Sequence, residues 1–199
     1  SNPLSIYVGQ LPEFCESEPN DTTADTAIEG PLPVVVNGQI LPGDVDRFRF
    51  EARQGERLVV AASARELMPY LADAVPGWFQ ATLALYDADG NEVAYADDFR
   101  FHPDPVFYYE IPEEGQYVLE IKDAIYRGRE DFVYRITLGE VPFVTGVFPL
   151  GARDGDQATV ELAGWNLPQD SITLDAEPKG PGIHPISVHN EELVSNRVP

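Results

Sequence analysis

The sequence has little cysteine and little positive charge. Cys15 is the one cysteine, so no disulfide can form within the chain. A chain without disulfides is compatible with the cytosol, or with a bacterial exported protein that a metal or a large core stabilises. No histidine or second cysteine lies near Cys15, and we expect it to be a small, buried or half-exposed apolar residue.

Basic residues are outnumbered: 13 Lys and Arg stand against 34 Asp and Glu, for a net charge of −21. This balance argues against nucleic acid, whose phosphates require basic patches, and against docking on anionic lipid. No apolar run approaches the length of a membrane span and no signal peptide is present, so we expect no membrane insertion. The charge suits a secreted, periplasmic or cell-surface protein that collects cations, and equally a plain acidic surface.

Catalytic motifs are scarce too. The histidines are His102, His184 and His189, and the chain has no Gly-x-Ser-x-Gly, His-Glu-x-x-His or Cys-x-x-Cys motif. Because these motifs are absent, we expect a protein that is not an enzyme. The alternative is a pair of carboxylates of the glycosidase kind, which leaves no motif in the sequence.

What the sequence does have is short runs of alternating apolar and polar residues, separated by turns rich in Gly, Pro and Asp. These runs predict an all-β protein with a β-sandwich. The clearest are Phe48–Ala52, Arg57–Ala62, Ala81–Tyr86, Glu92–Ala96, Val106–Ile111, Gln116–Ile121 and Phe132–Leu138. Turn residues between successive runs predict hairpins, including one from Phe48–Ala52 to Arg57–Ala62 and one from Val106–Ile111 to Gln116–Ile121.

Three further features set the predicted boundaries. Residues 3–11 are expected to form an N-terminal strand, and Asn37-Gly38 predicts a tight turn after Val34–Val36. Gly139–Pro142 is typical of a domain boundary. The expected organisation is an N-terminal strand over residues 1–13 that ends a preceding module, a sandwich over 14–140, and a smaller β module over 141–199.

An acidic stretch, Glu16–Thr22, supplies three carboxylates and one amide: Glu16, Glu18, Asn20 and Asp21. A second acidic group, Asp44 and Asp46, follows about twenty residues later. Such oxygen ligands suit a hard cation such as calcium, and carboxylates drawn together repel one another without a cation. The alternative is a solvated acidic linker beside an ordinary turn.

The order of these motifs resembles the bacterial pre-peptidase C-terminal domain, a family that includes the collagen-binding domains of clostridial collagenases. The residues that carry the resemblance are Glu16–Thr22, Asn37–Ile40, Asp44–Phe50, Leu83–Gly90, Asp97-Asp98 and Gly115–Leu119. The resemblance implies a jelly-roll-like β-sandwich, a non-catalytic role in an exported protein, and calcium held by Glu16, Glu18, Asn20, Asp21, Asp44 and Asp46. The tyrosines that bind collagen in those relatives have no matching position here.

Residues 141–199 more loosely resemble the immunoglobulin-like TIG/IPT domains, through Phe148–Gly151, Gly155 and Gly164–Leu167. That resemblance implies a scaffold or interaction module. We expect Trp165 to anchor its core.

Aromatic residues offer candidate ligand contacts. Trp78 lies beside the irregular stretch 63–77, and Tyr108 is the residue of the Phe107–Tyr109 run most apt to be exposed. Asp87–Gly90 has the look of a calcium loop, but it lacks the later acidic ligands, and a hairpin turn is favoured.

The sequence therefore favours a calcium-stabilised, non-catalytic module that binds an extracellular protein or polysaccharide, next to other domains of one long exported chain. The alternative is a structural spacer that binds nothing beyond its metal.

Overall fold

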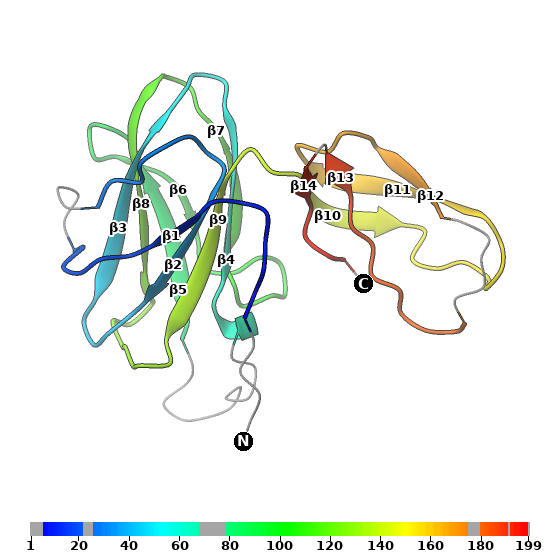
Figure 1. Cartoon of the computed structure of the whole chain (residues 1–199), viewed down its shortest axis with the longest axis horizontal. Helices are drawn as coiled ribbons and strands as arrows, with labels where there is room; N and C mark the ends of the chain where they lie inside the picture. The colour runs from blue at the N-terminus through cyan, green and yellow to red at the C-terminus, as the bar shows by residue number, and fades with distance from the viewer. Residues whose placement is uncertain (1–5, 22–25, 68–78, 175–179, 191, 199) are drawn as a thin grey trace. The chain divides into compact units, whose positions relative to one another are not determined.

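The structure is a computed structural model that describes residues 6–21, 26–67, 79–174, 180–190 and 192–198. Trp78, one of the two candidate ligand contacts, lies outside the described residues. The chain divides into two compact units, one of Glu13–Glu140 and one that comprises Ser1–Pro12 and Val141–Pro199. Each unit is all-β (Figure 1).

The larger unit is a sandwich of two sheets that pack against each other (Figure 1). The first sheet has the order β1-β2-β9-β4-β7, and its strands are Glu13–Cys15, Val34–Gln39, Val133–Gly139, Arg57–Ser63 and Val106–Glu110. The second sheet has the order β3-β8-β5-β6, and its strands are Val45–Ala52, Gly115–Asp123, Ala81–Tyr86 and Glu92–Ala96. All neighbouring strands are antiparallel except β1 and β2, which are parallel.

Alternation along the strands builds the core between the sheets. In β3, Phe48 and Phe50 are buried, while Arg47 and Arg49, which alternate with them, are partly exposed. This period of two places one side of each strand in the core. Both sheets contribute to one core cluster, in which the ring of Phe14 meets that of Phe48 edge to face.

The two predicted hairpins that join β3 to β4 and β7 to β8 are wrong. β3 pairs with β8 and β4 pairs with β7 and β9, so these consecutive strands lie in different sheets. A turn such as Gln54-Gly55 reverses the chain, but the turn residues do not determine whether the next strand stays in the same sheet. The crossing from one sheet to the other is typical of jelly-roll sandwiches. The predicted β5–β6 hairpin is present.

Three further local predictions are wrong. Residues 6–12 form no strand, and Ile6 and Val8 are both exposed, so their apolar pattern covers no core. Asn37-Gly38 is no turn: β2 continues to Gln39 and pairs with β9 along its whole length. Cys15 is exposed rather than buried.

The smaller unit contains a sheet of β10, β11 and β12 (Phe143–Phe148, Ala158–Trp165 and Ser171–Leu174). Two short strands, β13 and β14 (His189–Asn190 and Leu193–Val194), form a separate pair. Val144, Leu162 and Val188 form its small core, and the rings of Phe143 and Trp165 stack 5.5 Å apart.

Candidate metal centre

Main-chain hydrogen bonds place the acidic stretch between the two sheets at one end of the sandwich. The Glu16 N–H donates to the Asn37 carbonyl (2.9 Å), which extends the β1–β2 pairing by one residue. Further along, the Arg47 N–H donates to the Asn20 carbonyl (3.2 Å), so the stretch also lies along β3 of the other sheet. Glu16 and Asp46 are thereby brought together, although Glu16 follows a strand of one sheet and Asp46 lies on a strand of the other.

Three of the six predicted ligands converge. Glu16, Glu18 and Asp46 each offer a carboxylate oxygen, and these oxygens lie within 4.8 Å of one another. Asp46 is fully buried, Glu16 is partly buried and Glu18 faces solvent. This group of Glu16, Glu18 and Asp46, with the adjacent Asn20, is called the acidic corner below.

Tyr134, on β9, holds the buried part of the acidic corner. Its hydroxyl lies 2.9 Å from Glu16 Oε2 and within hydrogen-bonding distance of Asp46 Oδ2. Burial and the two carboxylates keep the pKa of Tyr134 well above its usual value, so the hydroxyl stays a donor. Since the hydroxyl has one hydrogen, it serves the two carboxylates best when one of them carries a proton of its own.

The surroundings of Asp46 favour its protonated form. Burial, and then the hydrogen bond to Glu16, raise the pKa of Asp46 to about 9. Burial and the nearby Asp44 likewise raise the pKa of Glu18 above its usual value. The corner therefore carries more negative charge than it can stabilise by itself.

The acidic corner contains oxygens that fit a cation. The side-chain oxygen Oδ1 of Asn20 and Oδ1 of Asp46 are both buried and have no hydrogen-bond partner. A buried acceptor left unpaired is costly, and each such group needs an explanation. Carboxylate and amide oxygens are the ligands that calcium prefers, so Glu16, Glu18, Asn20 and Asp46 fit a hard cation.

The other two predicted ligands are placed differently. Asp44 accepts hydrogen bonds from the N–H groups of Leu41 (3.1 Å) and Val45 (3.0 Å), so its carboxylate stabilises the turn that leads into β3. Asp21 is exposed, and its main-chain carbonyl accepts a hydrogen bond from the Arg47 guanidinium. Neither belongs to the group of converging carboxylates. Tyr108 lies half-buried on β7, away from the strands that form the corner.

Two residues of the site were missed from the sequence: Tyr134 and Gly38. Tyr134 lies in the cleanly alternating run Phe132–Leu138, and such a position is typical of an ordinary core residue. Gly38 was assigned to a turn, but a side chain there would overlap the Glu16 carboxylate and the Tyr134 hydroxyl. A glycine inside a strand marks a close approach, and that signal was available in the sequence.

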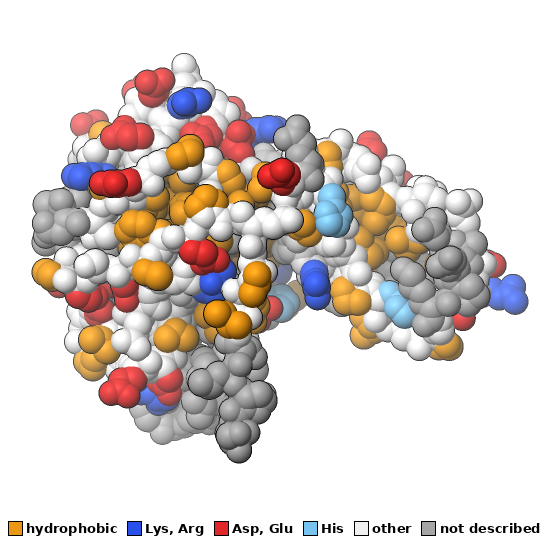
Figure 2. Space-filling view, viewed as in Figure 1, with side chains coloured by type: hydrophobic (Ala, Val, Ile, Leu, Met, Phe, Trp, Pro, Cys, Tyr) orange, Lys and Arg blue, Asp and Glu red, His pale blue; other side chains and the backbone are white. Residues whose placement is uncertain are grey.

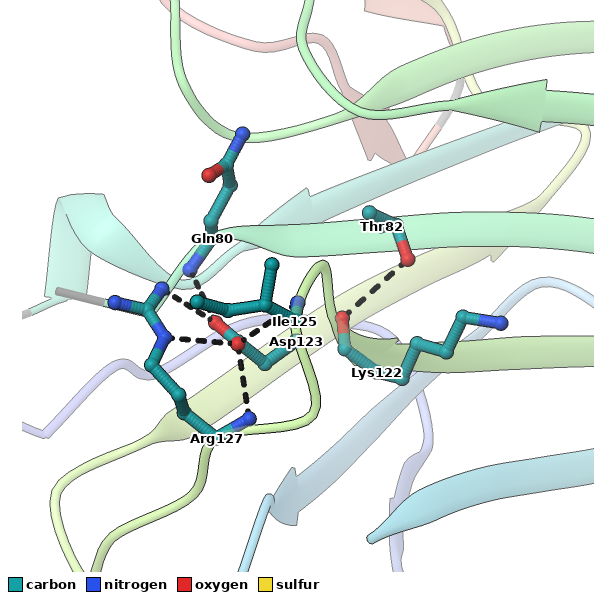
Figure 3. Close-up of polar contacts among 6 residues, drawn as sticks. All are labelled: Gln80, Thr82, Lys122, Asp123, Ile125 and Arg127. Carbon is teal, nitrogen blue, oxygen red and sulfur yellow. Dashed lines mark hydrogen bonds and ion pairs between the residues drawn. The ribbon is translucent and has the colours of Figure 1, made fainter. Parts of the chain in front are cut away.

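Other buried carboxylates serve the fold. Asp123 accepts hydrogen bonds from the N–H groups of Gln80, Ile125 and Arg127, and it forms a bidentate ion pair with the Arg127 guanidinium (Figure 3). Asp104 accepts from the N–H groups of residues 64–66, at the start of the 3₁₀ turn Arg65–Leu67. Since backbone and guanidinium donors already use these oxygens, the two carboxylates are structural.

Acidic side chains are also spread over the face of the larger unit seen in Figure 2. Asp87 forms a turn with Asn91, as favoured from the sequence: its Oδ1 accepts from the N–H groups of Asp89 (3.0 Å) and Asn91 (2.9 Å). Among the described residues, no helix is long and apolar enough to cross a membrane.

No protein-family model matches the chain. One curated relative is a probable subtilase-type serine protease of Deinococcus radiodurans, which is 32% identical over 109 residues. This match covers 54% of the present chain and 14% of the protease, so the chain spans a small part of that relative's length.

The solved structures that match the chain include the pre-peptidase C-terminal domain of a Bacillus anthracis collagenase, at 13% identity and a TM-score of 0.36. That match covers 67% of this chain and 99% of the collagenase domain. Another is PliG of Aeromonas hydrophila, a periplasmic inhibitor of g-type lysozyme, at 10% identity and a TM-score of 0.38, covering 66% of this chain and 98% of PliG. The pre-peptidase C-terminal domain is also the family that the sequence motifs resemble.

Proposed function

We propose that this chain is a non-catalytic module of a large exported bacterial protein, and that the acidic corner binds one calcium ion. One observation carries the proposal: three carboxylates from two separate segments converge, and two buried oxygens among these groups, on Asp46 and the adjacent Asn20, lack a partner. Glu16, Glu18, Asn20 and Asp46 would hold the ion. It would supply the positive charge that the carboxylates otherwise lack.

Calcium would act as a clamp between the sheets. Glu16 follows β1 of the first sheet and Asp46 lies on β3 of the second, so an ion bound to both joins the sandwich at this end. A ligand that binds the folded state alone stabilises it by mass action. Calcium is plentiful outside cells, so the clamp would form after export, when the module takes its place beside the neighbouring domains of its chain.

The role that we assign to the module is adhesion or targeting to an extracellular protein or polysaccharide. Among the described residues, the buried carboxylates outside the acidic corner are Asp104, Glu120 and Asp123. Backbone donors use Asp104 and Asp123, and Arg47 and Lys122 use Glu120, which supports a binding role over catalysis. The protease relative, of which the chain spans a small part, is consistent with an accessory module.

Thermal unfolding and calorimetry with calcium test the clamp. At 100 times the Kd, one bound ion adds about 2.7 kcal/mol, which raises the Tm of a unit of this size by roughly 10 °C. EDTA should reverse the rise. Absence of both a Tm shift and a heat of binding would overturn the proposal.

Asp46→Asn gives the sharpest variant. With EDTA at pH 7 its Tm should match or exceed the wild-type value, because the variant removes a carboxyl that is costly to ionise. With calcium the rise should be lost. Glu114→Gln, which neutralises an exposed carboxylate outside the acidic corner, is the matched control and should keep the full response.

A further inference from the structure

The outer face of the second sheet carries a row of side chains that the core does not use. Four cross-strand partners run across it: Arg47 on β3, Glu120 on β8, Ala84 on β5 and Tyr95 on β6. Arg47 and Glu120 alternate along their strands with buried core residues, so they point away from the core. Tyr95 is 50% exposed.

An ion-pair network around the buried Glu120 lies on this face, and its partners Arg47 and Lys122 are partly exposed. Glu120 is 2% exposed, although its side chain lies on the outer side of the sheet. One oxygen accepts from Arg47 Nε (2.8 Å) and Nη2 (2.7 Å), and the other accepts from Lys122 Nζ (2.7 Å). Because both oxygens are engaged, the three charged groups are held in fixed positions.

Next to this network lies a pocket of about 330 Å³. Val118 and Glu120 from β8, Arg47 from β3 and Tyr86 at the end of β5 line it, together with Gln116 and the turn 87–90. The turn is rigid, since Asp87 accepts hydrogen bonds from the residues that close it. The pocket therefore combines an aromatic ring, an aliphatic side chain and planar polar groups on a fixed frame.

We propose that this pocket, with Tyr95 on the neighbouring strand, binds an uncharged polysaccharide. A sugar ring presents C–H groups on its faces, which pack on aromatic and aliphatic side chains, and hydroxyls around its edge. Amide, carboxylate and guanidinium groups such as those of Gln116, Glu120 and Arg47 match these hydroxyls. A protein partner would instead require a broader apolar centre, with aromatic anchors that exclude water.

The charges of the pocket and of the whole chain favour an uncharged polysaccharide over an acidic one. Within the pocket, Arg47 is opposed by Glu120 and Asp87, so the pocket offers no net positive charge to an acidic glycan. The chain as a whole carries −21, which repels polyanions. This inference rests on the targeting role proposed above and not on calcium, because none of the residues of the acidic corner lines the pocket.

Affinity electrophoresis in native gels tests the proposal with the whole chain. The gels contain hydroxyethylcellulose, glucomannan or dextran as uncharged probes, polygalacturonate as a charged probe, or gelatin as a protein probe. We expect retardation by at least one uncharged polysaccharide. Tyr86→Ala and Gln116→Ala should each raise the Kd about tenfold, as loss of one aromatic or hydrogen-bonding contact does. Ile125→Ala, an exposed apolar side chain outside the pocket, should leave it unchanged.

Three results would overturn the proposal: no retardation by any uncharged probe, retardation by polygalacturonate or gelatin alone, or retardation that both pocket variants retain. Each variant is first checked for the wild-type Tm in EDTA, which separates loss of the pocket from loss of the fold. If no polysaccharide retards the protein in the gels, the rise in Tm with calcium can still be measured. If calcium does not raise the Tm, the gels can still be run in EDTA, so the two proposals fail separately.

Discussion

Gly38 and Tyr134 are cross-strand partners on β2 and β9, and the Tyr134 hydroxyl occupies the space that a Cβ atom on Gly38 would need. The Glu16 carboxylate reaches the same space. The missing side chain at position 38 therefore allows the tyrosine and the glutamate to meet above the strand. The buried half of the acidic corner depends on this contact.

Gly38→Ala should damage both stability and calcium binding. The added methyl group overlaps the Tyr134 ring and Glu16, and overpacking of this kind costs about 1–3 kcal/mol. Urea unfolding in EDTA measures the stability, and calorimetry measures the calcium Kd. Gly115→Ala is the matched control: Gly115 also lies in a strand, but a Cβ there meets nothing within 4 Å. If the two alanine variants behave alike, the packing argument for Gly38 fails.

Tyr134→Phe should weaken calcium binding by about 10- to 100-fold, the usual effect of removing a group that orients metal ligands. Loss of the hydroxyl leaves Glu16 and Asp46 without their shared donor and should also cost about 1–2 kcal/mol of stability. Tyr117→Phe separates the two effects, because the buried Tyr117 donates to the Glu113 carbonyl (2.9 Å), outside the corner. It should lower stability and leave the calcium Kd unchanged. Equal Kd values for the two variants would count against a role of Tyr134 in the site.

The sequence predicted the strands well because burial on one face leaves an alternation that can be read residue by residue. The run Phe48–Ala52 is an example, with Phe48 and Phe50 in the core. Which strands pair could not be read in the same way. β3 and β4 are joined by a short turn, yet they lie in different sheets, because pairing depends on the packing of the whole sandwich.

At the acidic corner, the sequence predicted Glu16, Glu18, Asn20 and Asp46 from the type and spacing of their oxygens. It could not separate them from Asp44, whose carboxylate is used by the N–H groups of its own turn. Local hydrogen bonds of this kind leave no trace in composition. Tyr134 could not be assigned either, since a buried tyrosine in an alternating strand looks like any core aromatic until the partner of its hydroxyl is known.

Asn20→Ala should reduce calcium affinity while changing the stability of the calcium-free protein little. Asn20 Oδ1 is buried without a hydrogen-bond partner, so its removal relieves a desolvation cost and offsets the loss of packing. Calorimetry and urea unfolding in EDTA give the two quantities. Thr26→Val is the control, because Thr26 Oγ1 is also buried and unpaired but lies beside Arg49. A calcium Kd that is unchanged in Asn20→Ala would remove Asn20 from the proposed ligands.

Asp123 should make the protein sensitive to acid. Burial alone would raise the pKa of Asp123, but the Arg127 guanidinium and the N–H groups around the carboxylate hold it below its usual value. A lowered folded-state pKa contributes stability above the unfolded-state value of about 3.9, and this contribution is lost as the pH falls through the folded-state value.

Asp123→Asn should cost about 3 kcal/mol at pH 7, since it removes the carboxylate that pairs with the Arg127 guanidinium. The difference in stability from wild type should shrink as the pH falls below about 4. Urea unfolding between pH 7 and pH 3 measures this difference. Asp131→Asn, which breaks the more exposed pair with Arg129, should cost less than about 1 kcal/mol. A cost for Asp123→Asn that stays constant over the whole pH range would show that the ionised carboxylate is not what holds this loop.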